Sequence, residues 1–200
     1  MPQRICLFGG TFDPIHCAHL RIAEEAVRAF GLDRVLFVPA GNPPHKDAGG
    51  LTRYQDRLRM VEIACAPYSH FEASRLEEGE GRSYTVETLI RFRAQVDVDD
   101  RIFFLIGADA FDELETWKNW RQVVTLTEFI VVARPGRVYR AIPGARVQAL
   151  ENLALPVSSS TIRERLAAGE PTPELPDGVR RFIEERGLYG YRKRPVTASQ

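Results

Sequence analysis

The chain has 200 residues, 44% of them hydrophobic and 27% charged, which predicts a globular protein rather than a disordered one. Lys plus Arg and Asp plus Glu number 27 each, so the chain lacks the basic excess typical of proteins that bind nucleic acid or anionic membranes. The three cysteines form no Cys-x-x-Cys pair, which argues against a disulfide framework or a structural zinc site. With no signal-peptide core and no apolar stretch near 18 residues, we expect a cytoplasmic protein.

Short apolar runs alternate with amphipathic stretches along the chain. Strands are predicted at 5–8, 34–38, 102–106, 129–133 and at either 145–150 or 153–155. Helices are predicted at 20–30, 53–66, 85–94, 160–168 and 177–186, with a broken helix over 110–124. This order predicts an α/β fold, a doubly wound, Rossmann-like parallel sheet with helices on both faces and a small C-terminal helical extension. We expect residues 1–190 to form a single domain and 191–200 a frayed tail.

A glycine turn joins the first strand to the first helix. Gly9 and Gly10 follow the apolar run, and glycine lets the backbone turn tightly and approach a ligand. Free N–H groups and the positive end of the helix dipole face such a turn, so it predicts an anion site. His16 and His19 lie three apart at the helix start and project from one side. One such histidine is often a cap or a packing residue, but two behind a Gly-Gly turn indicate chemistry on a polyphosphate.

Two later strands also end in residues suited to a nucleotide. Residues 38–46 follow the second strand and end in His45 and Lys46; three prolines fit a rigid connection, but the two cationic groups also suit phosphate. Asp109 follows the most apolar strand, where a carboxylate either binds ribose hydroxyls or caps a helix. Trp117 and Trp120 lie three apart, and either ring fits the core or a substrate base.

Residues 157–163, Val-Ser-Ser-Ser-Thr-Ile-Arg, begin a predicted helix near the C-terminus. Hydroxyl and N–H groups at a helix start bind anions, and Arg163 adds a charged fork one turn later. Thr161 and Glu164 also fit a capping box. The two interpretations are compatible, because a capped helix start is also a place that receives phosphate.

The pattern Gly-Gly-Thr-Phe-Asp-Pro-x-His-x-x-His at 9–19 resembles the signature of the HxGH nucleotidyltransferase superfamily, and residues 157–163 resemble its second signature. Ala18 stands where the first signature has glycine, and Ser160 where the second has threonine. Ser-Tyr-Thr-x-x-Thr-Leu at 83–89 and Trp117 narrow the resemblance to bacterial nicotinate-nucleotide adenylyltransferases. Gly-Ala-Asp at 107–109 and Val-Ala-Arg-Pro-Gly at 132–136 support it, and it extends over about residues 4–190.

The resemblance implies transfer of AMP from ATP to nicotinate mononucleotide, giving deamido-NAD and pyrophosphate. It also implies Mg²⁺ held mainly by the ATP phosphates, with no protein metal site, and no nucleic-acid or membrane partner. The implied catalytic residues are His16, His19, Lys46 and Arg163. The implied residues for ATP and its phosphates are Gly9, Gly10, Thr11, Phe12, Arg134, Ser159 and Ser160. The implied residues for nicotinate mononucleotide are His45, Thr85, Asp109 and Trp117.

The residues implied for nicotinate mononucleotide also predict selectivity between nicotinate and nicotinamide. Thr85 and the pair Trp117–Lys118 are each expected at the start of a helix, where free N–H groups favour the carboxylate of nicotinate over the amide of nicotinamide.

Two alternatives stay open. Another HxGH-type enzyme, such as a phosphopantetheine adenylyltransferase, would share the first motif but would need no pyridine pocket at Thr85 and Trp117. A non-catalytic nucleotide-binding sensor would account for Ala18. The sequence leaves the oligomeric state open, and a homo-oligomer is compatible with it.

Overall fold

The computed structural model describes residues 1–42, 50–79, 81–133, 139–151 and 157–191. Its described strands form one six-stranded parallel sheet in the order β3-β2-β1-β4-β5-β6. These strands are β1 (Arg4–Gly10), β2 (Arg34–Pro39), β3 (Phe71–Ala73), β4 (Arg101–Gly107), β5 (Glu128–Val132) and β6 (Val147–Leu150). The strand order reverses between β1 and β4, and such switch points are where open α/β sheets bind ligands.

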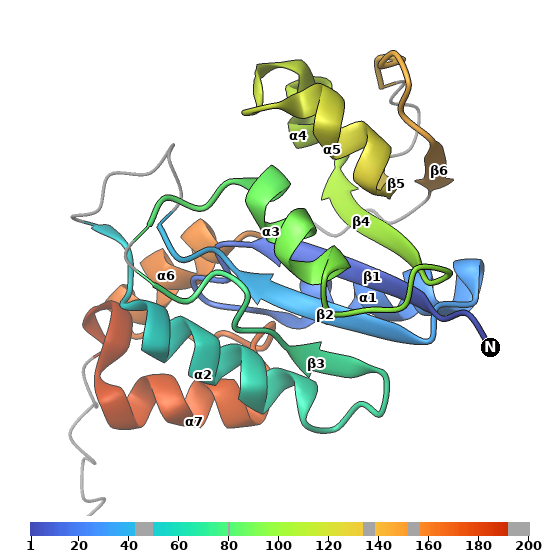
Figure 1. Cartoon of the computed structure of the whole chain (residues 1–200). Helices are drawn as coiled ribbons and strands as arrows, with labels where there is room; N and C mark the ends of the chain where they lie inside the picture. The colour runs from blue at the N-terminus through green and yellow to red at the C-terminus, as the bar shows by residue number, and fades with distance from the viewer. Residues whose placement is uncertain (43–49, 80, 134–138, 152–156, 192–200) are drawn as a thin grey trace, which may run out of the picture.

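Helices cover both faces of the sheet. The described helices are α1 (Cys17–Phe30), α2 (Tyr54–Cys65), α3 (Thr85–Arg93), α4 (Ala108–Asp112), α5 (Trp120–Leu126), α6 (Ser159–Ala168) and α7 (Asp177–Arg186), with 3₁₀ turns η2 (Leu114–Thr116) and η3 (Leu188–Gly190). In Figure 1, α3, α4 and α5 lie above the sheet, and α2 and α7 lie below it. None of these helices is long and apolar enough to cross a membrane.

The two hydrophobic cores follow from the alternation of side chains along each strand. Cys6 of β1 and Phe103 of β4 point to the core that α1, α2, α6 and α7 cover. Ile5 and Leu7 point to the other face, where they meet α3, α4 and α5 together with Phe104. Strands buried on both faces read as continuous apolar runs. This burial explains why β1 and β4 were recognisable from the sequence.

The predicted fold class is confirmed, and most predicted elements differ from the structure only at their ends. The expected helix 20–30 begins at Cys17, so His19 lies inside its first turn. The broken helix 110–124 is three short elements, because Asn119 adopts a left-handed backbone conformation before α5. The strand β3 was not predicted; it has three residues at a sheet edge. The alternative strand at 153–155 lies outside the described residues.

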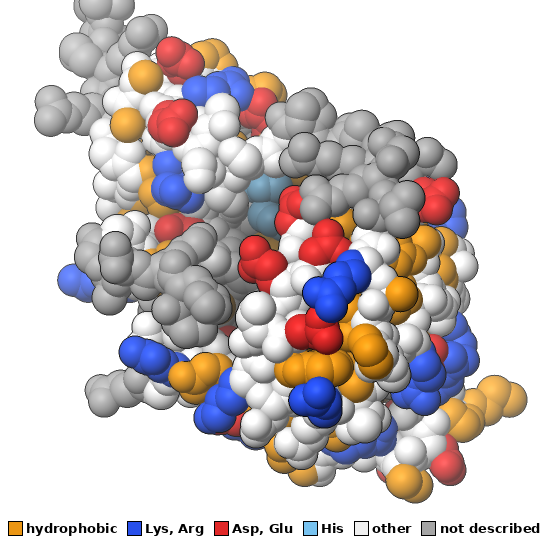
Figure 2. Space-filling model, turned by 90° about the horizontal axis from the view of Figure 1, so that it is seen from above, with side chains coloured by type: hydrophobic (Ala, Val, Ile, Leu, Met, Phe, Trp, Pro, Cys, Tyr) orange, Lys and Arg blue, Asp and Glu red, His pale blue; other side chains and the backbone are white. Residues whose placement is uncertain are grey.

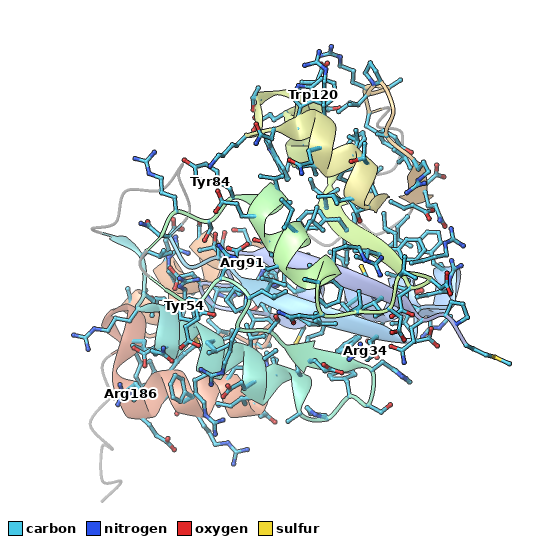
Figure 3. The ribbon with its side chains drawn as sticks, in the orientation of Figure 1. Arg34, Tyr54, Tyr84, Arg91, Trp120 and Arg186 are labelled. Carbon is cyan, nitrogen blue, oxygen red and sulfur yellow. The ribbon has the colours of Figure 1, made fainter. Side chains whose placement is uncertain are left out.

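The C-terminal extension packs beside α2. Arg186 at the end of α7 forms an ion pair with Asp56 of α2, at 3.3 Å, and Figure 3 shows Arg186 and Tyr54 in this same layer. Beyond α7, the hydroxyl of Tyr189 donates to the carboxylate of Asp13 at 2.7 Å. The last described turn therefore contacts the loop after β1, which carries the first motif.

Candidate active site

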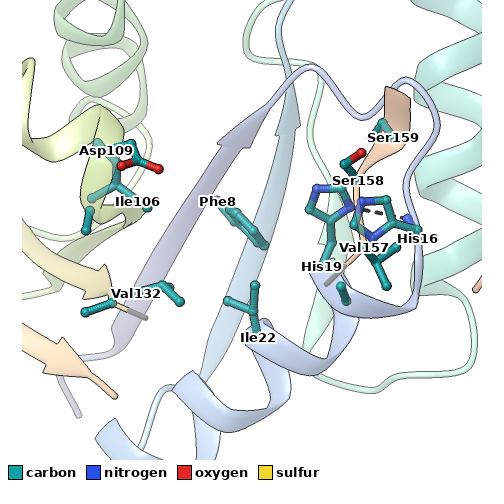
Figure 4. A pocket seen from close by; sticks show the side chains of 14 residues that line it. Phe8, His16, His19, Ile22, Ile106, Asp109, Val132, Val157, Ser158 and Ser159 are labelled. Carbon is teal, nitrogen blue, oxygen red and sulfur yellow. Dashed lines mark hydrogen bonds between the residues drawn. The ribbon is translucent and has the colours of Figure 1, made fainter. Parts of the chain in front are cut away.

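A cavity of about 390 Å³ opens beside the switch point, beyond the carboxyl ends of β1 and β4. We call it the histidine cavity. Its lining residues are Phe8, His16, Ala18, His19, Ile22, Ile106, Gly107, Ala108, Asp109, Val132, Ala133, Val157, Ser158 and Ser159. Figure 4 shows the two histidines and the serines on one side and Asp109 opposite, with Phe8 between them. In the space-filling view, histidine side chains lie inside a hollow of this face (Figure 2).

The two histidines of the first motif form a stacked pair. Their ring centroids lie 3.7 Å apart with an interplanar angle of 23°. His16 is the N-cap residue of α1, and its backbone N–H donates to Nδ1 of His19 at 3.3 Å. Because Nδ1 of His19 accepts, the proton of the neutral ring is on Nε2. His19 can thus donate a hydrogen bond from Nε2 to an anion without carrying a charge.

Both imidazoles are held neutral at pH 7. Burial lowers the pKa of His16 to about 4, and the nearby Glu174 carboxylate opposes this shift. Burial and the neighbouring His16 lower the pKa of His19 well below 6.5. His16 is 4% exposed, and among the described residues its Nδ1 has no hydrogen-bond partner. The two histidines are therefore buried, neutral rings, and an anionic ligand in the cavity would polarise them.

The turn after β1 presents its N–H groups because its carbonyls are occupied elsewhere. The carbonyl of Gly10 accepts from Ala40 N at 2.8 Å, and that of Thr11 accepts from Arg57 Nη1 at 2.7 Å. In a trans peptide, the following N–H points opposite to the carbonyl. The N–H groups of Thr11 and Phe12 have no acceptor among the described residues. These two adjacent donors are thus unpaired in the described part of the chain, and neither residue is among those that line the histidine cavity.

The glycines of the motif serve packing more than backbone conformation. A Cβ at Gly10 would lie 2.9 Å from the Phe12 ring, and one at Gly9 would lie 3.1 Å from Phe104. Both residues belong to β1, and the left-handed conformation of the turn occurs at Phe12, with φ of 49°. The expectation that the glycines make the tight turn is corrected in this respect: they admit two aromatic rings.

The second motif holds the first one in place. Ser159 Oγ donates to the Pro14 carbonyl at 3.0 Å. The Arg163 guanidinium donates to the Asp13 carbonyl at 2.7 Å and to Ser160 Oγ at 3.3 Å. These contacts join α6 to the β1–α1 turn across about 150 residues of chain, the Arg163–Asp13 separation being 150. Arg163 therefore stabilises the turn after β1, whether or not it also contacts a ligand.

The start of α6 is capped by a residue that the sequence analysis did not single out. Ser158 Oγ accepts from the backbone N–H of Thr161 at 3.2 Å, and Ser158 lines the histidine cavity. Thr161 is already the third residue of α6, so it does not form the capping box with Glu164 that the sequence also allowed. Ser160 does not line the cavity. Its hydroxyl faces Arg163 instead.

A second cavity, of about 260 Å³, lies next to the first, and we call it the tryptophan cavity. Its lining residues are Phe8, Gly9, Gly10, Val38, Ala40, Glu77, Ser83, Thr85, Phe104, Leu105, Ile106, Gly107, Ala110 and Trp117. The Trp117 ring meets Phe104 edge to face, with centroids 6.3 Å apart. Thr85 is the first residue of α3, as predicted. Thr85 and Trp117, the two residues expected around the pyridine, thus line one cavity.

The expected helix start at Trp117 and Lys118 is wrong. Trp117 ends the 3₁₀ turn η2, and its N–H donates to the Leu114 carbonyl at 3.0 Å. Lys118 Nζ forms an ion pair with Glu87 at 2.8 Å and lies over the Tyr84 ring. Trp117 therefore contributes its ring to the cavity but no free backbone donor.

Four further predicted residues need placing. Asp109 lines the histidine cavity, whereas Thr85 and Trp117, which were predicted to bind the acceptor together with it, line the tryptophan cavity. His45, Lys46 and Arg134 lie outside the described residues.

Comparison with known proteins places the chain in a family. Residues 7–165 match the cytidylyltransferase-like family model. A probable nicotinate-nucleotide adenylyltransferase of Solibacter usitatus is 47% identical over 187 residues, covering 94% of this chain and all of the relative. The corresponding protein of Shouchella clausii is 43% identical over 190 residues, covering 94% of this chain and 97% of the relative.

Solved structures agree with the fold. The Plasmodium falciparum nicotinic acid mononucleotide adenylyltransferase complexed with NaAD has a TM-score of 0.79 at 19% identity, covering 95% of this chain and 98% of that one. Its complex with APC has a TM-score of 0.77 at 18% identity, covering the same shares. The assignment of the chain to a family rests on the sequence relatives, which align with it over nearly their whole length. The chain belongs to the nicotinate-nucleotide adenylyltransferase family, the adenylyltransferases of NAD biosynthesis.

Proposed function

We propose that this chain transfers the adenylyl group of ATP to nicotinate mononucleotide, with ATP in the histidine cavity and the acceptor in the tryptophan cavity. The observation that carries the proposal is the wall that both cavities share. Phe8, Ile106 and Gly107 line both of them. Two substrates so placed at the switch point have their phosphates in reach of each other.

The chemistry needs no protein nucleophile. An oxygen of the nicotinate mononucleotide phosphate, ionised at pH 7, attacks the α-phosphorus of ATP. That P–O bond forms as the bond from the α-phosphorus to the bridging oxygen of the β-phosphate breaks, and pyrophosphate leaves with the electron pair. The protein contributes alignment of the two phosphates and stabilisation of charge on the transferred group.

Residues of both motifs and of the neighbouring strand ends are assigned to these two tasks. The Nε2–H of His19 serves the α-phosphate, and the N–H groups of Thr11 and Phe12 serve the other phosphate oxygens. His16, Lys46 and Arg163 are assigned to the polyphosphate. Asp109, opposite the histidines in Figure 4, suits the ribose hydroxyls of ATP. Arg134 retains its sequence-based assignment to ATP, and His45 its assignment to the acceptor.

Mg²⁺ is proposed to enter with ATP. Within the described ranges, no three His, Cys, Asp or Glu side chains group closely enough to hold a metal ion. An ion held by phosphate oxygens and water fits this arrangement, since Mg²⁺ usually keeps several waters and binds substrate phosphates. When bound there, the ion would neutralise charge on the departing pyrophosphate.

Pyrophosphate release from ATP, measured with a panel of acceptors, tests the proposal. The panel contains nicotinate mononucleotide, nicotinamide mononucleotide and phosphopantetheine, each at several concentrations. The proposal predicts the highest kcat/KM with nicotinate mononucleotide. Preference for phosphopantetheine would assign the chain to another branch of the superfamily, and ATP binding without turnover would make it a sensor.

A further inference from the structure

Arg57 of α2 is a fully buried cation, 0% exposed, that the sequence gives no reason to notice. Its Nε donates to the Thr52 carbonyl at 2.9 Å, Nη1 to the Thr11 carbonyl at 2.7 Å and Nη2 to the Ala40 carbonyl at 2.7 Å. Its guanidinium lies 5.6 Å from the ring centroid of Tyr54, which Figure 3 labels. One side chain thus joins the turn after β1, the end of β2 and the entry to α2.

The charge of Arg57 is balanced at a distance rather than by an ion pair. No carboxylate of the described residues forms an ion pair with its guanidinium. Burial lowers the pKa of Arg57, and the nearby Asp13 carboxylate opposes this shift. Asp13 is 3% exposed and accepts from Tyr189 OH at 2.7 Å and from Thr52 N at 3.4 Å. Burying a charge is costly unless its hydrogen bonds are made, and here backbone carbonyls make them.

By holding the Thr11 carbonyl, Arg57 also fixes the direction of the N–H group of the same peptide. Because β1 lies between β2 and β4, the Gly10 carbonyl that accepts from Ala40, the residue after β2, directs the Thr11 N–H toward the β4 side. The Thr11 carbonyl that binds Arg57 directs the Phe12 N–H away from α2. A buried cation on the carbonyl also polarises the peptide group and strengthens its N–H as a donor.

We propose that Arg57 is a positioning residue for the phosphates of ATP: it fixes and polarises the Thr11–Phe12 peptide so that its N–H faces the anion. The inference rests on the proposed ATP site. It predicts that a change at Arg57, which does not line either cavity, weakens phosphate recognition.

Substitutions at Arg57 and at a neighbouring arginine provide the first test. Arg57→Met removes the charge and the donors, whereas Arg57→Lys keeps a charged donor group but not the planar guanidinium that reaches three carbonyls. Arg59→Met is the matched control, because Arg59 is an exposed residue of the same helix paired with Glu62. A misplacement near 1 Å costs about 100-fold in rate, so kcat/KM for ATP is expected to fall about 100-fold in Arg57→Met and less in Arg57→Lys. The activity of Arg59→Met should stay unchanged. Unchanged kcat/KM in a folded Arg57→Met protein would overturn the inference.

A phosphate titration of the unmodified protein and of Arg57→Lys covers the case in which Arg57→Met fails to fold. Inorganic tripolyphosphate is titrated into ¹⁵N-labelled protein, and the amide resonances of Thr11 and Phe12 are followed. We expect both to shift, and the affinity for tripolyphosphate to fall at least about tenfold in Arg57→Lys, the equivalent of one hydrogen bond to a charged group. No shift at these amides, or equal affinity in Arg57→Lys, contradicts the inference. The titration needs no acceptor, so inactivity with nicotinate mononucleotide would overturn the proposed function separately.

Discussion

The backbone N–H of His16 donates to Nδ1 of His19, so the first histidine of the motif fixes the tautomer of the second. The spacing of three residues makes this contact possible, since an N-cap residue and the third helical residue lie on one face. Burial, and secondly the His16 ring stacked on it, lowers the pKa of His19, so this ring stays neutral. The pair therefore supplies an oriented N–H donor before ATP arrives.

Substitutions at His19 distinguish its two nitrogens. His19→Asn retains an acceptor near Nδ1 but no donor near Nε2, whereas His19→Gln retains a donor near Nε2. We expect His19→Ala and His19→Asn to fold and to lose about two to three decades of kcat, and His19→Gln to lose less. Steady-state turnover measures this, with His70→Ala, an exposed histidine outside the cavity, as control. Near-normal turnover in a folded His19→Asn protein would remove the role assigned to Nε2.

The neutral histidines also predict how stability depends on pH. The pKa of His16 is about 4 in the folded protein against 6.5 as its ordinary value, so the unfolded chain takes up a proton first as pH falls. Below pH 6.5 this group should lower the free energy of unfolding by about 1.4 kcal/mol per pH unit, down to pH about 4. Above pH 6.5 its contribution is constant.

Urea unfolding at several pH values compares the protein with His16→Gln, whose side chain does not titrate. The variant should gain stability relative to the unmodified protein as pH falls from 6.5. A difference between the two that stays constant with pH would show that His16 titrates normally in the folded state.

Much of this architecture could be predicted from the sequence, and the elements and contacts that could not be predicted have physical causes. β1 and β4 are buried on both faces, so their apolar runs are continuous. β3 lies at an edge and has only three residues, too few for a periodic pattern. The histidine turn was predictable because its residues are adjacent in sequence. Arg57, Tyr189 and Ser158 were not, because their contacts join distant segments or depend on where a helix begins.

Ala18 lines the histidine cavity at the second position of α1, where the superfamily signature has glycine. If its methyl group crowds ATP, Ala18→Gly should tighten ATP binding and should destabilise the protein by about 1 kcal/mol, the usual cost of glycine in a helix. Ala29→Gly, an exposed change in the same helix, is the control for helix propensity. Calorimetry with ATP decides: equal or weaker affinity in Ala18→Gly means that the backbone already accommodates the methyl group.

Selectivity between nicotinate and nicotinamide mononucleotide depends on the donors of the tryptophan cavity. Since the Trp117 N–H is occupied, donors for the carboxylate are expected at the start of α3, beside Thr85. We predict at least about tenfold higher kcat/KM for the acid, because one mispaired buried polar contact costs more than about 1 kcal/mol. Thr85→Ala should reduce this preference modestly, because backbone groups carry most of it.

Trp117→Ala should raise KM for both mononucleotides by the same factor, since it removes an aromatic wall without regard to charge. Trp120→Ala is the matched control, because Trp120 does not line the cavity. Equal efficiency with acid and amide in the unmodified protein would instead indicate a dual-specificity enzyme.

The central claim is that a phosphate oxygen of nicotinate mononucleotide attacks the α-phosphorus of ATP and displaces pyrophosphate, and an isotope experiment tests it most directly. The protein is supplied with ATP and with nicotinate mononucleotide whose phosphate oxygens are labelled with ¹⁸O, and the products are analysed by mass spectrometry. The account predicts deamido-NAD that retains every labelled oxygen, together with unlabelled pyrophosphate. Absence of deamido-NAD, or label in the pyrophosphate, would contradict it.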